Sequence, residues 1–213
     1  MATYALDFDT AKLAALGVKL EGLTGADMGK AITTSLNDVV DKAYDLSRKR
    51  MIKGINLTDT YLRRKMVLTK ATDARPVASI LAEGLQTQLR NFGANMVLVP
   101  RTTARPDRNK GKLGIPKGMK QFGTSVEVPI GERQRFPHTF MLPLKRGDVD
   151  GGNGLGVFSR PKGGGKPRRM LGPAVYQLFK YQFKGTLLGE TEEMLSTALA
   201  TQVQAAIEKA LDK

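Results

Sequence analysis

The chain has 213 residues and a formal net charge of +14, and 41% of its residues are hydrophobic, which is enough for a folded core. This composition excludes disorder, which goes with low hydrophobicity, and the absence of Cys excludes disulfides and thiolate metal sites. The sequence shows neither an apolar run near the ~20 residues that span a bilayer nor a secretory signal, so we expect a protein made in the cytoplasm.

The first predicted element is a long helix over residues 24–55, which follows an N-terminal arm of residues 1–23. Thr24 can accept hydrogen bonds from the free N–H groups of the first turn, and Gly54 can end the helix. Apolar residues recur at steps of three and four and form one stripe: Met28, Ile32, Leu36, Val39, Ala43 and Leu46. Thr58 can then cap a short second helix in the segment NLTDTYLRRKM.

Strands and loops are predicted over residues 66–172. The strands are short, β-branched and bounded by Gly, Pro or Asp: VLTKAT, RPVASILA, NMVLVP, TSVEVPI and HTFMLPL. Pro129 places TSVEVPI near a sheet edge, and Phe140, Leu142 and Leu144 form an apolar row in HTFMLPL.

Two segments without periodicity, residues 101–121 and 147–156, predict long mobile loops that serve as interaction surfaces. The second leads into VFSR–PKGGGKP–RRML, which predicts a hairpin with a flexible tip, so that the extended loop region covers 147–169.

The last third returns to helix. One or two helical turns are expected after Pro173, and a C-terminal helix is expected over residues 187–212. Its apolar residues step by four: Leu195, Leu199, Val203, Ile207 and Leu211. The fold class is therefore α+β, with a mixed, mainly antiparallel sheet flanked by the two long helices and long basic loops. We expect a single domain over residues 1–213.

Motifs for catalysis or cofactor binding fail on inspection. RPKGGGKPRRM is not a phosphate-binding loop, because Pro167 replaces the Ser or Thr after Lys166 and Arg160 stands where the first Gly is required. His138 is the only His, which makes a transition-metal site or a catalytic triad a poor prospect. We expect no enzyme, no cofactor and no metal site.

Charge is the remaining signal. Residues 48–120 hold seventeen Lys and Arg against four Asp and Glu, whereas residues 1–47 hold four against seven. Such a block favours a polyanionic or acidic partner. With few aromatics nearby, contact with nucleic acid should be non-specific and with the duplex backbone. The alternatives are acidic faces of partner subunits or a merely solubilising surface. The candidate DNA or partner contacts are Arg48, Lys49, Arg50, Lys53, Arg63, Arg64, Lys65, Lys110, Lys112, Lys117, Lys120, Arg160, Lys162, Lys166, Arg168 and Arg169.

The order of elements also carries a resemblance. A long helix enters the basic segment SRKRMIKGINLTDTYLRRKMVLTKA, the segments ARPVASI and LQTQLRNFGA follow, and GPAVYQLF precedes the last helix. Over residues 28–211 this resembles the minor tail protein Z family of long-tailed bacteriophages, also described as tail completion proteins. The loops 101–121 and 147–156 match no family pattern.

The resemblance implies a structural virion protein in the neck, at the head-proximal end of the tail, that helps head–tail joining and genome passage. It implies a homo-oligomeric ring, with six copies to match tail symmetry. The implied partners are tail terminator, tail tube and head–tail connector proteins, with non-specific contact to genomic DNA and no membrane. The alternative function is that of a free, non-specific RNA- or DNA-binding basic protein.

Overall fold

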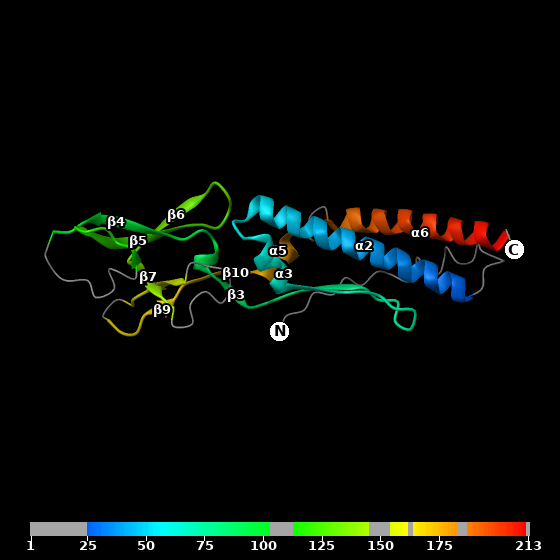
Figure 1. Ribbon diagram of the computed structural model, residues 1–213, viewed down its shortest axis with the longest axis horizontal. Helices are drawn as coiled ribbons and strands as arrows, with labels where there is room; N and C mark the ends of the chain where they lie inside the picture. The colour runs from blue at the N-terminus through cyan, green and yellow to red at the C-terminus, as the bar shows by residue number, and fades with distance from the viewer. Residues whose placement is uncertain (1–24, 103–112, 145–153, 162–163, 183–186, 212–213) are drawn as a thin grey trace. The chain divides into compact units, whose positions relative to one another are not determined.

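The computed structural model describes residues 25–102, 113–144, 154–161, 164–182 and 187–211 (Figure 1). The chain divides into two compact units. Unit 1 contains residues up to Arg50, then Arg63–Gly84 and Val175–Lys213, and unit 2 contains Met51–Leu62 and Leu85–Ala174. The α+β class is confirmed. Each unit is made of separate segments of the chain. The single domain over residues 1–213 stays a prediction.

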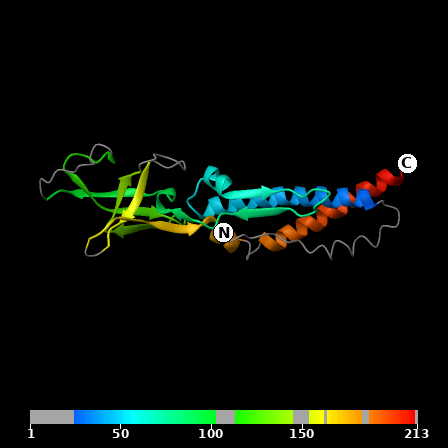
Figure 2. The same ribbon diagram turned by 90° about the horizontal axis from the view of Figure 1, so that it is seen from below.

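Unit 1 is built around a pair of long helices. These are α2 (Gly25–Gly54, of which residues 25–50 belong to unit 1) and α6 (Leu188–Leu211). The antiparallel strands β1 (Met66–Thr69) and β2 (Ser79–Ala82) form a hairpin, and α5 (Val175–Gln182) follows it in the unit. Figure 1 shows α2 between α6 and the β1–β2 hairpin, and Figure 2 shows the hairpin lying along α2. The long helices predicted at 24–55 and 187–212 are thus confirmed, although Thr24 lies outside the described residues.

The apolar stripes of these helices form the core of unit 1. Leu36, Val39 and Ala43 of α2 are buried as predicted, and Val40 widens the stripe. In α6, Leu195 and Leu199 are buried. The hairpin contributes Met66 and Ile80, and α5 contributes Phe179. Asn37 of α2 holds the end of β1 by donating to the carbonyl of Ala71 at 3.1 Å and accepting from its N–H at 2.7 Å.

Unit 2 holds small antiparallel sheets joined by short turns. One sheet pairs β3 (Gln86–Gln88) with β10 (Leu171–Ala174), and a 3-10 turn (Leu89–Asn91) follows β3. A second has the order β4 (Asn95–Pro100), β5 (Met119–Glu127), β6 (Arg133–Pro137). A third has the order β7 (Thr139–Pro143), β8 (Leu155–Ser159), β9 (Arg168–Arg169). Antiparallel pairing is confirmed, but the strands are shared among several small sheets.

The short helix α3 (Asp59–Lys65) links the two units. Thr58 caps it as predicted, because the N–H of Tyr61 donates to Oγ1 of Thr58 at 3.2 Å. Tyr61 and Leu62 are buried. Within the described ranges, every helix is too short or too polar to cross a membrane.

Two strand predictions were wrong in detail. TSVEVPI was expected at a sheet edge because of Pro129, but β5 is the central strand of its sheet. The strand ends at Glu127, so Pro129 lies outside it and does not interrupt its pairing. Pro129 instead forms an isolated bridge with Ile55. In β7 the expected row of Phe140 and Leu142 is only half-buried, whereas Thr139 and Met141 on the other face are buried.

The predicted loops are shorter than expected. Residues 119–121 of the first loop already belong to β5, and Leu113 and Ile115 are buried at 7% and 6% exposure. Residues 155–156 of the second loop belong to β8. Residues 103–112 of the first predicted loop and residues 147–153 of the second lie outside the described residues. The chain after residue 112 is therefore anchored in unit 2 by apolar side chains.

Candidate functional site

The positive charge of the protein is concentrated in unit 2. Counted over the whole sequence, unit 2 holds 18 Lys and Arg against 6 Asp and Glu, a net charge of +12. Unit 1 holds 16 against 14, a net charge of +2. An excess confined to one folded unit creates a local positive potential that attracts anionic partners. The sheets of unit 2 are therefore the candidate interaction surface.

The strand pairing of the hairpin predicted at residues 157–171 is confirmed. Phe158 lies opposite Arg169, and Ser159 lies opposite Arg168, in antiparallel register between β8 and β9. Gly164 and Gly165 have φ of 93° and 110°, a left-handed conformation that glycine adopts without strain, so they reverse the chain before β9. Lys166, Arg168 and Arg169 are exposed, and Lys162 lies outside the described residues.

Phenyl rings and a guanidinium lie together on one face of the β7–β8–β9 sheet. Phe140 lies opposite Phe158, and their rings stack at a centroid distance of 6.4 Å with planes 24° apart. The Cζ of Arg160 lies 5.7 Å from the centroid of the Phe140 ring, within the range of a cation–π contact. We name Phe140, Phe158, Arg160 and Arg169, together with the exposed Lys166 in the turn just before β9, the cationic face.

A second group of arginines lies on β6 and was missed by the sequence reasoning. Arg133 donates to Oε2 of Glu127 at 2.8 Å and to the carbonyl of Gly93 at 3.2 Å. The guanidinium of Arg135 lies 5.6 Å from the ring centroid of Phe122, which is 52% exposed. Alternating charged residues in RQRFP, next to a Gly-containing turn, are the sequence signal that could have marked an exposed strand here.

Glu127 ties the turn between β5 and β6 to this group. Its Oε1 accepts a hydrogen bond from the N–H of Gly131 at 2.8 Å. That contact, with a smaller contribution from Arg133, lowers the pKa of the Glu127 carboxyl from its ordinary value of 4.5, against an opposing effect of desolvation. The turn is thus held by an ionised carboxylate at neutral pH.

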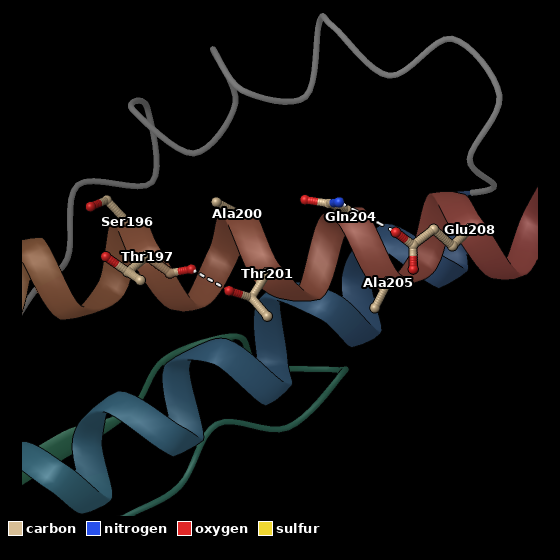
Figure 3. A pocket seen from close by; sticks show the side chains of 7 residues that line it. All are labelled: Ser196, Thr197, Ala200, Thr201, Gln204, Ala205 and Glu208. Carbon is tan, nitrogen blue, oxygen red and sulfur yellow. Dashed lines mark hydrogen bonds between the residues drawn. The ribbon is translucent and has the colours of Figure 1, made fainter.

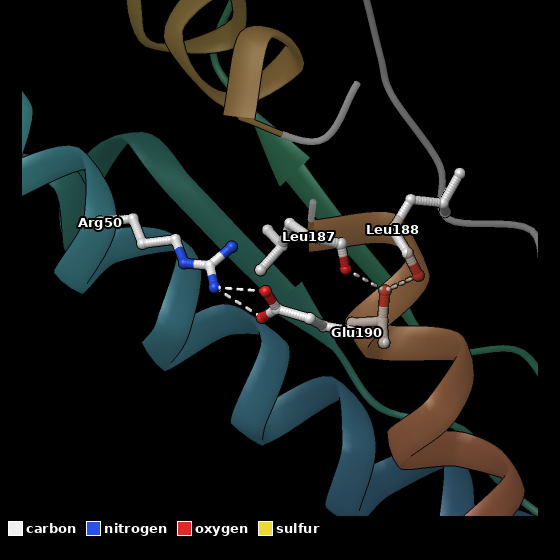
Figure 4. Close-up of polar contacts among 5 residues, drawn as sticks. Arg50, Leu187, Leu188 and Glu190 are labelled. Atoms are coloured by element: carbon white, nitrogen blue, oxygen red, sulfur yellow. Dashed lines mark hydrogen bonds and ion pairs between the residues drawn. The ribbon is translucent and has the colours of Figure 1, made fainter. Parts of the chain in front are cut away.

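Several predicted contacts in unit 1 serve the fold itself. Arg48 is buried at 3% exposure, donates to Asp45 at 2.7 Å, and lies over the Tyr44 ring at 4.8 Å. Arg50 of α2 binds Glu190 at the start of α6 (Figure 4). Lys65 pairs with Glu83 at 2.8 Å. Arg48 is held within α2, whereas Arg50 and Lys65 join different elements of unit 1, and these contacts leave the three cations less available to a partner.

The remaining predicted contacts are dispersed. Lys49, Arg63 and Arg64 are exposed in unit 1, and Lys53 and Lys117 are exposed in unit 2. Lys120 is half-buried on β5, opposite Val99 of β4. Lys110 and Lys112 lie outside the described residues. The structure therefore places Arg160 and Arg169 on one face of the β7–β8–β9 sheet, whereas the other described cations of the prediction lie on separate elements within their own units.

A shallow groove runs along α6 and has a different character. It is lined by Ser196, Thr197, Ala200, Thr201, Gln204, Ala205 and Glu208 (Figure 3). Its hydroxyls donate within the helix, as when Thr201 donates to the carbonyl of Thr197 at 2.9 Å. A further groove between α2 and α6 is lined by both acidic and basic side chains, including Asp38, Lys42 and Glu193. Neither groove converges on a reactive group.

His138, the only His, occupies the turn between β6 and β7. It is exposed and has φ of 64°, so its position is set by a left-handed turn. Among the described residues, no three His, Cys, Asp or Glu side chains lie close enough together to hold a metal ion.

Comparison with known proteins gives one family. The family model described as prophage minor tail protein Z matches residues 15–213, which covers nearly the whole chain and both units. Neither a curated protein nor a solved structure gives a significant match.

Proposed function

The chain belongs to the prophage minor tail protein Z family, whose members are structural proteins of the phage tail, and we propose that it is a tail completion protein. In this role it occupies the neck, at the head-proximal end of the tail, and aids head–tail joining and passage of the genome. The family match over residues 15–213 is the observation that carries the proposal. The expectation drawn from the sequence resemblance is thereby confirmed at the level of the family.

The distribution of charge supports a place along the path of DNA. Unit 2 has a net charge of +12, and unit 1 has a net charge of +2. A neck component meets two kinds of partner, protein subunits and the genome, and a cationic unit beside a nearly neutral one suits that division. Unit 2 is the part that we assign to the side of the DNA.

We also propose the assembly that this position requires. The protein forms a ring, with six copies to match the symmetry of a tail, and contacts tail terminator, tail tube and connector proteins. The exposed grooves of α6 lie on the nearly neutral unit, where contact with another subunit carries little electrostatic cost. A ring of defined symmetry should appear when assembled tails, rather than isolated subunits, are imaged.

Electron microscopy of purified virions tests the position. The protein is labelled by an epitope tag at its C-terminus, and the label should lie at the junction of head and tail. A phage lacking the gene, complemented by the tagged protein, is the control that the tag preserves infectivity. Label at the distal tip, or absence of the protein from purified particles, would contradict the proposal.

The second candidate function is that of a free, non-specific nucleic-acid-binding protein. The net charge of +14 and the sequence pI of about 10.1 favour it. The same experiment separates the two functions, because a free binder remains in the nucleic-acid fraction of infected cells and is absent from purified virions. Co-purification in fixed proportion to the major tail proteins would exclude it.

A further inference from the structure

The cationic face of unit 2 is built by the register of the β7–β8–β9 sheet. In an antiparallel sheet, residues directly opposite each other share a face. Phe140 pairs with Phe158, and Phe158 pairs with Arg169, so these three side chains form one row across the strands. Arg160 stands two residues beyond Phe158, and its guanidinium lies over the Phe140 ring. The neighbouring Arg168 pairs with Ser159, which places it on the opposite side of the pleat.

The phenyl rings of this face support the cations. Phe140 and Phe158 are half-buried, and each covers part of the other. Arg160 lies over the Phe140 ring at 5.7 Å, which orders the guanidinium while its N–H groups remain able to reach acceptors in solvent. With a guanidinium over one ring and the rings against each other, they are poor platforms for stacking bases of a single strand.

The cations of the face have no carboxylate partner within the part of the chain that the structure describes. Elsewhere in the described residues, Arg50, Lys65 and Arg133 each form an ion pair with a glutamate. No ion pair in that part of the chain involves Arg160, Lys166 or Arg169. All three are exposed. Exposed, unneutralised cations in a unit with a net charge of +12 are suited to an anion that presents several negative charges in a row.

We propose that the cationic face binds the phosphodiester backbone of double-stranded DNA without reading its sequence. Arg160, Lys166 and Arg169 each neutralise a phosphate, and Phe140 and Phe158 keep Arg160 in place. This inference rests on the proposed function, in which the genome passes through the neck. Phosphate contacts position a protein on DNA and carry no sequence information, as passage of a whole genome requires.

Binding of a labelled duplex by the full-length protein tests the proposal. Fluorescence anisotropy is measured with a DNA duplex of arbitrary sequence while the salt concentration is varied. Each phosphate contact contributes about 0.9 to the slope of log K against log salt. The variant carrying Arg160→Gln, Lys166→Gln and Arg169→Gln should therefore lower the slope by about 2 to 3 and weaken binding about tenfold or more at low salt.

A matched variant separates the face from net charge. Lys30→Gln, Lys42→Gln and Arg75→Gln together remove three exposed cations of unit 1 and change the net charge equally. This variant should bind the duplex nearly as wild type. An equal loss in both variants would overturn the proposal, as would wild-type protein that fails to bind the duplex at low salt. Circular dichroism melting of each variant shows that it is folded.

Two comparisons sharpen the assignment. Arg169→Gln should weaken binding more than Arg168→Gln, since the two arginines leave β9 on opposite sides of the pleat. Equal effects would overturn the assignment to this face. Tighter binding of a single strand, or of poly-glutamate with the same dependence on these residues, would overturn the choice of duplex DNA as the partner.

The inference and the proposed function fail in different ways. Protein found in the neck that binds no duplex would overturn the inference and leave the proposed function standing. Protein that binds the duplex through this face but is absent from virions would overturn the proposed function.

Discussion

Arg50 on α2 donates through Nη2 to both carboxylate oxygens of Glu190 on α6, at 2.7 Å to Oε1 and 2.6 Å to Oε2 (Figure 4). The pair joins the C-terminal part of one long helix to the first turn of the other, across 140 positions of sequence. Beside it, the hydroxyl of Thr191 donates to the carbonyls of Leu187 and Leu188 at 2.7 and 2.8 Å. The start of α6 is therefore fixed by both a long-range and a local contact.

Exchange of these two charges tests their contribution to unit 1. Arg50→Glu and Glu190→Arg should each lower the free energy of unfolding by about 1 kcal/mol, because the pair is partly exposed and each single variant places like charges together. The double variant should recover most of that loss. Urea denaturation of the four proteins gives the coupling energy. Additive losses in the double variant would show that the pair contributes nothing to stability.

The apolar stripe of α6 predicts a larger effect. Leu199 is 4% exposed, so Leu199→Asp buries an unpaired carboxylate in the core of unit 1. We expect a loss of about 3 kcal/mol in the free energy of unfolding, measured by urea denaturation. Ala200→Asp is the control, because Ala200 is exposed on the same helix. Similar losses for the two substitutions would contradict the orientation of α6.

The close approach of β5 and β6 depends on a glycine. A Cβ at position 123 would lie 2.6 Å from the carbonyl oxygen of Phe136, so Gly123→Ala must push the strands apart. The expected cost is about 2 kcal/mol in the free energy of unfolding. Gly29→Ala is the matched control, since a Cβ in α2 there meets nothing within 4 Å and alanine favours helix by up to about 1 kcal/mol. Thermal melts should shift in opposite directions, and a tolerated Gly123→Ala would contradict the register.

The helices could be predicted from sequence because their apolar stripes repeat over many turns. In α2 the apolar residues Leu36, Val39 and Ala43 recur at helical spacing and are all buried. In α6 apolar residues recur every four positions, which predicts a helix in the same way. In β7, apolar residues stand on both faces, so alternation alone could not decide whether Phe140 or Met141 is buried. The central place of β5 depends on its pairing with β4 and β6, which short segments do not encode locally.

The sequence predicted which residue types make up the candidate site, but it did not predict how they are arranged in space. The sequence marks the 160–169 hairpin by its glycines and cations, and the structure adds the Phe140 ring beneath Arg160, contributed by another strand. Arg48 and Lys49 look alike in sequence, yet one is buried against Tyr44 and the other is exposed, because successive residues of a helix point in different directions. The partner of Arg50 could not be found without the packing of the two helices.

Acid should release the turn between β5 and β6. The pKa of Glu127 is lowered from 4.5 in the folded protein, so the carboxylate contributes stability that is fully present above pH 4.5 and is lost as the pH falls through the folded pKa. Glu127→Gln removes this contribution. Wild type should therefore be more stable than the variant at pH 7, and the difference in stability should be smaller in acid, at about pH 3, than at pH 7.

Urea midpoints at both pH values measure the Glu127 contribution, and exchange of the Gly131 amide proton reports on the turn directly. Glu132→Gln is the matched control, because it removes a neighbouring exposed carboxylate while leaving the contacts of Glu127 with Gly131 and Arg133 in place. This control should keep the wild-type loss of stability in acid. A gap between wild type and Glu127→Gln that stays constant from pH 7 to about pH 3 would mean that the carboxylate charge does not hold the turn.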